Sequence, residues 1–292
     1  MLPVDLVTPV ELLLAEMSGT SVKISDSVAV GGGCINEARL LKTTAGKYFI
    51  KYNSSAIFPG MFEKEAAGLK ILSDTNTLVV PEIIGSEESG KHAFLLLQYI
   101  ENGIPPKNFW IEFGTELATL HRNTNELFGL DYDNYIGSLV QSNKRNTDFY
   151  GFFISERIEP QLREARNKGA LSQSDTRYFD SLFSSLKNII PPEKPALIHG
   201  DLWSGNFMVT SGGSPCIIDP AVYYGHREAD IAMTQLFGGF PPGFYDAYNQ
   251  AWPMEKGWQQ RIDVFNLYSL LVHVNLFGGS YVGQVLRIIR QF

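Results

Sequence analysis

The sequence predicts an α+β fold in two lobes: a small antiparallel β lobe with one main helix, and a larger, mostly helical lobe. The length of 292 residues suits a two-lobed chain. Strand-like patterns dominate before residue 100, and helical spacing of apolar residues dominates after it. The turn-forming segment 101–106 separates the two patterns, so we expect residues 1–100 in the N-terminal lobe and residues 101–292 in the C-terminal lobe.

The N-terminal lobe is expected to begin with a helix. Thr8 suits its N-cap, Pro9 suits its first helical position, and Glu11 completes a capping box. A second helix is expected over 62–72, where apolar residues recur at helical spacing behind acids in the first turn. The other apolar segments, bounded by glycine or proline, predict strands at 22–30, 37–42, 47–52, 79–84 and 94–100.

The C-terminal lobe is predicted to be largely helical. Short strand-like segments interrupt the helices and enclose a polar loop at 199–207. A polar loop held between short strands is a typical platform for an active site. Helical periodicity is found at 109–123, 148–168, 174–188, 227–237 and 259–277.

Composition and charge exclude several classes of function. The net charge of −7, without a block of five like charges, argues against a large basic face for nucleic acid or anionic lipid. No apolar stretch approaches the length of a membrane span, and the N-terminus lacks a signal-peptide pattern. Cys34 and Cys216 are too few for a disulfide framework. We therefore expect a cytoplasmic protein that binds neither nucleic acid nor membrane.

Several common catalytic and nucleotide-binding motifs are absent from the sequence. Gly46-Lys47 lacks the first glycine of a Walker A motif, and Asn36 stands where a dinucleotide fingerprint needs its third glycine. The patterns HExxH and GxSxG do not occur. These absences leave the acids and amides of the polar loop as the candidate chemistry.

Asp201, Asn206 and Asp219 follow one another in an order that suits phosphoryl transfer. Asn206 comes five residues after Asp201, and Asp219 follows an apolar strand, which is the kinase order of catalytic Asp, metal-binding Asn and metal-binding Asp. The reaction needs a group that accepts the proton of the attacking hydroxyl, here Asp201, and oxygen ligands for Mg²⁺, here Asn206 and Asp219. Taken alone, the same residue types also suit an ordinary turn.

Companion residues in the N-terminal part favour the catalytic interpretation. Gly31, Gly32 and Gly33 lie between two predicted strands, Lys51 lies near the end of the third strand, and Glu65 lies on the next helix. A lysine on a strand or a glutamate in a first helical turn is often only an exposed charge. In this order the residues predict an ion pair that presents Lys51 to the α- and β-phosphates of ATP.

The chain resembles the fructosamine kinase (ketosamine-3-kinase) family, which is related to aminoglycoside and choline kinases and has a protein-kinase-like fold. The pattern His-Gly-Asp-x-x-x-x-Asn at 199–206 is shared by many small-molecule kinases, whereas Asp-Leu-Trp-x-Gly-Asn at 201–206 and Asn-Tyr-Ile-Gly at 134–137 are narrower. The resemblance covers nearly the whole chain, with further matching segments at 31–38, 61–69, 117–121, 128–143, 152–161 and 219–230.

The resemblance implies a nucleotide site and an acceptor site. ATP would bind between the lobes with Mg²⁺, and the backbone of Gln98, Tyr99 and Ile100 would contact adenine. Asp201 would act as base or orienting group for the 3-hydroxyl of a ketoamine, either a small molecule or protein-bound. Trp203 would offer the sugar an aromatic face, and the alternative is a core tryptophan that braces the loop.

The resemblance also implies a consequence of the reaction and two supporting residues. A phosphate at C3 is a good leaving group, so the phosphorylated adduct can decompose and release the amine, which makes the reaction a deglycation repair step. Asp230 is expected to support the catalytic loop by hydrogen bonds. His199 is expected to be structural, since a neutral imidazole can bond backbone groups there.

Two alternative functions stay open at this stage. One is phosphorylation of another hydroxylated amine, such as an aminoglycoside or an amino alcohol. The other is a nucleotide-binding redox sensor with little turnover. Cys34 lies in the glycine loop, where free N–H groups and Lys51 can lower the pKa of its thiol, so the protein is expected to be a monomer or a redox-dependent homodimer through Cys34. The alternative for Cys34 is a small residue tolerated in a tight turn.

Overall fold

The computed structural model describes residues 1–31 and 35–292. The chain divides into two compact units: Met1–Phe109 with Phe207–Asp219, and Trp110–Asn206 with Pro220–Phe292. The segment Phe207–Asp219 belongs to the first unit because its backbone bonds there. Gly103 N–H donates to Val209 O and Ile217 N–H donates to Val79 O, each at 2.9 Å. The single boundary predicted at residues 100 and 101 therefore differs from this division.

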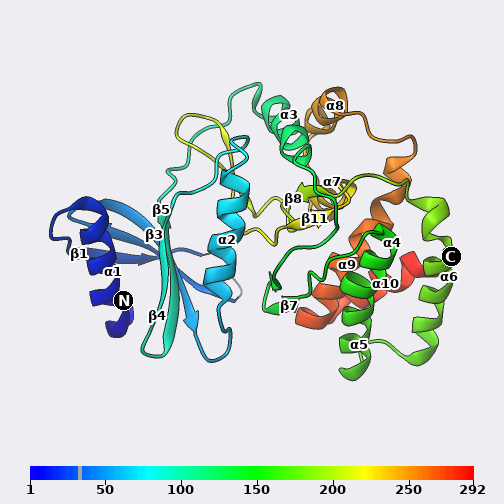
Figure 1. Cartoon of the computed structure of the whole chain (residues 1–292), viewed down its shortest axis with the longest axis horizontal. Helices are drawn as coiled ribbons and strands as arrows, with labels where there is room; N and C mark the ends of the chain where they lie inside the picture. Colours follow the sequence, from blue (N-terminus) through cyan, green and yellow to red (C-terminus); the bar gives the residue numbers. More distant parts are fainter. Residues whose placement is uncertain (32–34) are drawn as a thin grey trace. The chain divides into compact units, whose positions relative to one another are not determined.

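The first unit is built on an antiparallel sheet whose strands run in the order β1-β2-β3-β5-β4 (Figure 1). This arrangement confirms the β lobe predicted from the sequence. A two-stranded hairpin of β9 and β10 completes the unit. The strands are β1 (Ile24–Ala29), β2 (Glu37–Thr43), β3 (Gly46–Ser54), β4 (Ile83–Ser89), β5 (His92–Gln98), β9 (Phe207–Val209) and β10 (Pro215–Ile217).

Two helices, α1 (Val4–Ser18) and α2 (Met61–Ser73), cover opposite faces of this sheet (Figure 1). Ile50 in β3 and Leu96 in β5 are buried in the cluster that contains α1, and Leu95 is buried in the cluster that contains α2. Side chains alternate between the two faces of a strand. Lys51, which follows Ile50, therefore faces α2.

Helix α1 begins earlier than the sequence predicts. Thr8 and Pro9 lie inside it, so the predicted N-cap at Thr8 is wrong. Because Pro9 has no N–H, the carbonyl of Asp5 loses its partner in the helix. The hydroxyl of Ser89 donates to that carbonyl at 2.9 Å instead, so a contact with β4 satisfies the group that proline leaves unpaired.

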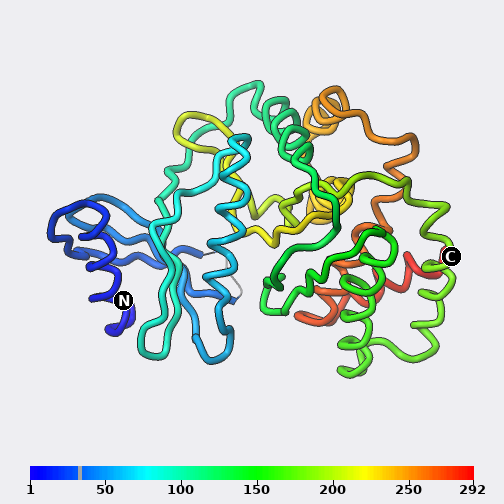
Figure 2. Tube along the Cα trace, in the orientation of Figure 1, coloured from blue at the N-terminus to red at the C-terminus, as the bar shows by residue number. Residues whose placement is uncertain are grey.

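The second unit is mostly helical, as predicted, with α9 at its centre. Helix α9, the orange segment before the red C-terminus in Figure 2, packs against α5, α7 and α10. Its buried residues lie on several sides, as expected for a central helix. The helices are α3 (Phe109–His121), α4 (Phe149–Phe152), α5 (Glu159–Asn167), α6 (Gln173–Ile189), α7 (Glu228–Leu236), α8 (Pro242–Ala251), α9 (Trp258–Phe277) and α10 (Ser280–Ile289).

Four short strands pair in the second unit, and one helical segment is irregular. β6 (Asn134–Ile136) pairs with β7 (Leu139–Gln141), and β8 (Ala196–Ile198) pairs with β11 (Tyr223–Gly225). Between α4 and α5 the chain forms a π-helical turn, η1 (Phe153–Ile158), inside the single helix predicted over 148–168. π-helical turns often occur at functional sites.

Helices α8 and α10 were not predicted from the sequence. Helix α8 begins at Pro242, and proline is tolerated in a first turn because its missing N–H would have no partner there. Helix α10 follows Gly278 and Gly279, both with a φ of +62°. Across the described part of the chain, every helix is too short or too polar to cross a lipid bilayer.

Candidate active site

Lys51, Glu65 and Asp219 form a charged cluster in the first unit. Lys51 Nζ lies 2.7 Å from Glu65 Oε1 and 2.5 Å from Asp219 Oδ1. The ion pair predicted between Lys51 and Glu65 is therefore present. It forms because Lys51 faces α2 and Glu65 lies on α2. Asp219, at the end of the segment that packs on this unit, adds a second carboxylate.

The charge of Lys51 is maintained despite its burial. Its side chain is only 7% exposed, and burial by itself lowers the pKa of a lysine. The carboxylates of Asp219 and Glu65 outweigh that effect and hold the pKa of Lys51 above its usual value. Lys51 is thus a fixed ammonium group at neutral pH, as a phosphate-binding lysine must be.

Asp219 is more exposed than its two partners and adopts an unusual backbone conformation. Its side chain is 44% exposed. Its φ of +56° lies in the left-handed region, which residues other than glycine rarely adopt. Such strain costs of order 1–3 kcal/mol and is often found at functional sites. The carboxylate offers oxygen atoms of the kind that Mg²⁺ prefers.

Asp230, at the start of α7, binds the backbone at the beginning of the loop 199–206. Its carboxylate accepts hydrogen bonds from the backbone N–H of His199 at 2.7 Å and of Gly200 at 2.9 Å, and His121 Nε2 lies 3.1 Å away. Burial raises the pKa of Asp230, but the hydrogen bond and charge of His121, with the backbone donors, hold it below its usual value. The predicted support of the loop by Asp230 is confirmed.

Gly200 and His199 fit the loop closely to the segment that follows Asp219. Gly200 has a φ of +83°, and a Cβ there would lie 2.2 Å from the carbonyl oxygen of Ala221. Ala221 N–H donates to His199 O at 2.9 Å. The His199 ring is fully buried, and its Nδ1 accepts from Asp201 N–H at 3.3 Å, which is the structural role predicted for it.

Asn206 holds Asp201 within the loop. Its side-chain Nδ2 donates to the carbonyl oxygen of Asp201 at 2.8 Å and to Asp201 Oδ2 at 3.0 Å. Asn206 is 6% exposed, so this geometry is enforced by packing. Because the Asn206 nitrogen is committed to Asp201, the amide oxygen is the atom left for a cation. The donor atoms of Asn206 and Asp219, each considered in its own unit, therefore fit the oxygen ligands that Mg²⁺ requires.

Trp203 begins a row of aromatic side chains. Its ring lies 5.6 Å from that of Phe237 in an edge-on contact, the Phe237 ring lies 4.9 Å from that of His273, and the His273 ring lies 4.9 Å from that of Tyr281. All four side chains are only partly buried. Gly205 allows the Trp203 ring to lie close, since a Cβ there would approach ring carbons at 2.4 Å. Trp203 is partly buried and packs against its own loop, so the predicted contact of its ring with a sugar stays a prediction beside the alternative of a loop-bracing tryptophan.

A buried amide network, to which the sequence assigned no role, fixes the segment after Asp219. Gln141 Nε2 donates to Ala221 O at 3.1 Å and to Asn134 Oδ1 at 2.8 Å, and Asn134 Nδ2 donates to Val222 O at 2.9 Å. The hydroxyl of Tyr268 donates to Gln141 Oε1 at 2.8 Å. Buried amides without charged partners carry no spacing signal in a single sequence, so only the contacts show this function.

Arg157, in the π-helical turn, extends the same network. It is fully buried, and it donates to Asn143 Oδ1 at 2.7 Å and to Ser142 O at 2.5 Å. Its guanidinium lies 3.8 Å from the ring centroid of Tyr223. The cation is therefore stabilised by carbonyl oxygens and an aromatic face.

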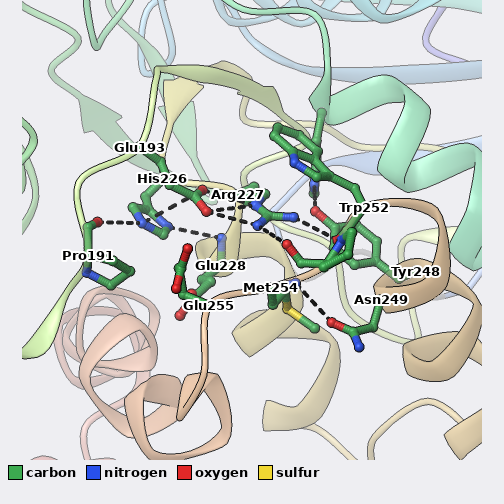
Figure 3. A network of polar contacts seen from close by, with 12 residues as sticks. Pro191, Glu193, His226, Arg227, Glu228, Tyr248, Asn249, Trp252, Met254 and Glu255 are labelled. Carbon is green, nitrogen blue, oxygen red and sulfur yellow. Dashed lines mark hydrogen bonds and ion pairs between the residues drawn. The ribbon is translucent and has the colours of Figure 1, made fainter.

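Glu193 and Arg227 form the centre of a separate polar network (Figure 3). Arg227 is 2% exposed, makes three hydrogen bonds of 2.8 to 3.0 Å to the Glu193 carboxylate, and donates to Trp252 O at 2.9 Å. Its guanidinium lies 4.1 Å from the centroid of the Trp252 ring. This network joins the segment before β8 to the end of α8, so its role is structural.

The first unit contains four more of the predicted site residues: Gly31, Gln98, Tyr99 and Ile100. Gly31 is exposed, with open space where a Cβ would be, whereas Gly32, Gly33 and Cys34 lie outside the described residues. At the end of β5, Gln98 is exposed, Tyr99 is half-buried and Ile100 is buried. Cys216 is buried, and burial raises the pKa of its thiol to about 12.

The chain is similar in sequence, over nearly its whole length, to one protein family. Residues 7–292 match the sequence model of a family described as fructosamine kinase. The chain is 41% identical to a probable ketoamine kinase of Enterococcus faecium, with 91% of this chain and 94% of that protein covered. It is 37% identical to a chloroplastic protein-ribulosamine 3-kinase of Arabidopsis thaliana, with 97% and 86% covered.

Solved structures show the same fold. A crystal structure from Thermobifida fusca, provisionally named a fructosamine-3-kinase, has a TM-score of 0.87 and 33% identity over 97% of this chain and 98% of that one. An aminoglycoside phosphotransferase in complex with ADP and hygromycin B has a TM-score of 0.62 and 17% identity over 96% and 98%. The second similarity extends to the fold alone.

Proposed function

We propose that this chain, which belongs to the fructosamine kinase family, transfers the γ-phosphoryl group of ATP to the 3-hydroxyl of a ketosamine. Relatives named for ketoamine and ribulosamine phosphorylation are similar over more than nine-tenths of the chain, and the residues that the reaction needs are present in order. The reaction product is a ketosamine 3-phosphate. Loss of that phosphate from the enaminol form frees the amine.

The observation that carries this proposal is the placement of Asp201 by Asn206 within a loop supported by Asp230. A carboxylate fixed in this way can accept the proton of an attacking hydroxyl or orient that hydroxyl toward phosphorus. Phosphoryl transfer depends mainly on positioning and on compensation of charge. The hydrogen bonds that hold the loop would therefore contribute to catalysis by positioning Asp201.

The nucleotide would be bound by residues of the first unit. Lys51, held by Glu65, is assigned to the α- and β-phosphates, and the glycine run 31–33 is assigned to the phosphate chain. Backbone groups of Gln98, Tyr99 and Ile100 are assigned to adenine. Mg²⁺, when bound, offsets the charge of the phosphate oxygens, and the oxygen atoms of Asn206 and Asp219 are assigned to hold it.

The acceptor would be bound by the aromatic row that begins at Trp203. Aromatic faces suit the apolar faces of a sugar and the charge of an amine. His273 adds a polar atom to this row: its Nδ1 is bonded to Ser269 O at 2.7 Å, which places the proton on Nδ1 and a lone pair on Nε2 in the neutral ring. Burial holds the pKa of His273 below its usual value, so the neutral ring dominates at pH 7.

We place this reaction in the cytoplasm, because two cysteines in 292 residues suit a reducing compartment. The redox-dependent dimer through Cys34 remains a proposal. On a non-reducing gel, an oxidant should produce a dimer of the wild type and not of Cys34→Ser. A dimer in both proteins would overturn this proposal.

The decisive experiment measures ATP consumption with Mg²⁺ against ribulosyl-lysine, fructosyl-lysine, unmodified lysine, kanamycin and choline. Wild type is compared with Asp201→Asn and with Asp131→Asn, a control at an exposed acid whose partner is Arg145. Circular dichroism verifies that all three proteins are folded. We expect turnover of ketosamines only, with a loss of about 10²-fold or more in Asp201→Asn. Phosphorus NMR should place the new phosphate at C3.

Other outcomes of this experiment identify the alternatives. Turnover of kanamycin or choline alone would make the chain a kinase of another hydroxylated amine. ATP binding without turnover of any acceptor would favour a nucleotide-binding sensor. Full activity of folded Asp201→Asn would remove Asp201 from the chemistry.

A further inference from the structure

A groove of about 360 Å³ opens in the second unit where the segment after α7 meets α8 and α9. Its size is within the range of ligand sites in proteins. Gly238 and Gly239, which have φ values of +97° and +72°, form part of its wall with bare backbone. No residue assigned above to ATP, Mg²⁺ or the ketosamine lines this groove.

Two aromatic rings form an ordered wall of the groove. The rings of Tyr245 and Trp258 stack with their centroids 6.0 Å apart and an angle of 27° between their planes. The hydroxyl of Tyr245 accepts from Phe240 N–H at 3.2 Å and shares a hydrogen bond with Thr234 at 3.1 Å. These bonds fix the Tyr245 ring, so the wall exists before any ligand binds.

Asp246 supplies the charge of the groove. It is exposed, it is the one charged side chain in the lining, and it has no hydrogen-bond or ion-pair partner within 1–31 and 35–292. Gln235 and Gln259 line the same space. A carboxylate beside stacked aromatic rings is complementary to a cation, and a planar guanidinium fits both at once.

The chain segment that forms part of the groove wall begins next to a residue, Phe237, that contacts the loop carrying Asp201. Phe237 directly precedes the two glycines, its ring contacts Trp203, and its carbonyl oxygen accepts from Ser204 Oγ at 3.3 Å. Because Phe237 contacts Trp203 and is followed directly by two residues of the groove wall, we infer that a ligand bound at the aromatic row can reach the groove past this residue. The acceptor in the proposed reaction continues in this way only when its amine belongs to a peptide or protein.

We propose that the groove binds an arginine or lysine side chain that flanks a protein-bound ketoamine. The inference rests on the proposed function for the identity of the acceptor, and on Asp246, Tyr245 and Trp258 for the basic side chain. The net charge of −7 of the chain adds a general attraction for basic segments. The protein would therefore prefer ketoamines in basic surroundings over the same ketoamine as a free amino acid.

The test compares three substrates: free ribulosyl-lysine, a ribulosyl-lysine peptide with one arginine two to five residues away, and the same peptide with alanine. Wild type is compared with Asp246→Asn and Trp258→Phe. The matched control is Asp180→Asn, at an exposed acid of α6. We expect the KM of wild type for the best arginine peptide to be about three- to tenfold below that for the alanine peptide. Asp246→Asn should lose this preference, with unchanged kinetics on free ribulosyl-lysine.

A binding measurement separates the groove from the proposed reaction. Isothermal titration with the unglycated arginine peptide should show binding to wild type and to Asp180→Asn, and weaker binding to Asp246→Asn. If this pattern holds while no ketosamine is phosphorylated, the groove stands and the proposed reaction fails. Equal binding or equal KM for the arginine and alanine peptides in wild type would overturn the groove proposal, as would a preference that persists in Asp246→Asn.

Discussion

Asn206 donates its side-chain amide both to the carbonyl oxygen of Asp201 at 2.8 Å and to its carboxylate at 3.0 Å. One residue thus fixes the backbone and the side chain of the proposed catalytic group. The hydrogen bond holds the carboxylate of Asp201 in one orientation, as a group that accepts a proton or orients a hydroxyl requires. The remaining amide oxygen of Asn206 is assigned to Mg²⁺, so the residue has two separable roles.

We predict that Asn206→Ala lowers kcat by about 10²-fold and also raises the Mg²⁺ concentration needed for half-maximal rate. Both roles of the side chain are removed in this variant. In Asn206→Asp the oxygen is kept but a carboxylate lies beside Asp201, where repulsion between like charges raises the pKa of the pair. The pH profile of kcat should therefore shift upward in Asn206→Asp. An unchanged Mg²⁺ dependence in Asn206→Ala would limit the residue to positioning Asp201.

Removal of Lys51 should destabilise the protein through Glu65. Lys51→Met leaves the buried Glu65 carboxylate without its counter-charge, and we expect a loss of about 3–5 kcal/mol in the free energy of unfolding by urea. The double variant Lys51→Met/Glu65→Leu should recover part of that loss, since no buried charge is left unpaired. Neither variant should phosphorylate a ketosamine.

An exposed pair in the same unit provides the control for Lys51. Lys47 and Glu101 lie 2.7 Å apart with side chains 51% and 59% exposed. Lys47→Met should cost no more than about 1 kcal/mol because water screens such pairs. Equal losses in Lys51→Met and Lys47→Met would contradict the importance of burial in this prediction.

Substitution of Gly205 should disturb the acceptor site through Trp203. A Cβ at position 205 would lie 2.4 Å from two carbons of the Trp203 ring, so the ring has to move in Gly205→Ala. We expect the KM for the ketosamine to rise about tenfold while the KM for ATP is unchanged. Gly212→Ala is the matched control, because a Cβ there meets only Thr210 Oγ1, at 3.8 Å. An unchanged ketosamine KM in Gly205→Ala would show that the Trp203 face does not bind the acceptor.

His226 should make the protein less stable in mild acid. Its Nε2 bonds to Pro191 O at 3.2 Å and its Nδ1 accepts from Glu228 N–H at 3.3 Å, so the neutral ring is fully satisfied (Figure 3). Burial holds the pKa of His226 below its usual value of 6.5, and this outweighs the opposite effects of Glu193 and Glu228. The unfolded chain therefore binds a proton more readily, and stability falls as the pH decreases below 6.5.

Urea unfolding at several pH values between 7.5 and 5 tests this prediction. His226→Asn should be less stable than wild type at pH 7.5 but should lose less stability on acidification. The partly exposed His92→Asn variant serves as the comparison. A slope in His226→Asn as steep as that of wild type would assign the acid sensitivity to other groups.

Local patterns in the sequence were sufficient for the elements that alternate or repeat cleanly. The strands around Lys51 and the helix that carries Glu65 were predicted, and the ion pair followed from their order. The start of α1 was not predicted, because Pro9 resembles a first helical position in sequence. Its place inside the helix depends on Ser89, 84 residues away from Asp5 along the chain.

The sequence alone was sufficient to select the candidate residues for phosphoryl transfer, because this reaction restricts which residue types can serve and in which order they occur. These candidates are Lys51, Glu65, Asp201, Asn206 and Asp219. The tertiary structure alone decided how the loop is held. Asp230 reaches it from α7, and Gln141 reaches the following segment from β7. The groove beside Asp246 likewise depends on three segments meeting. Such contacts join residues far apart in the chain, and hydrogen-bond geometry between distant segments leaves no local pattern to read.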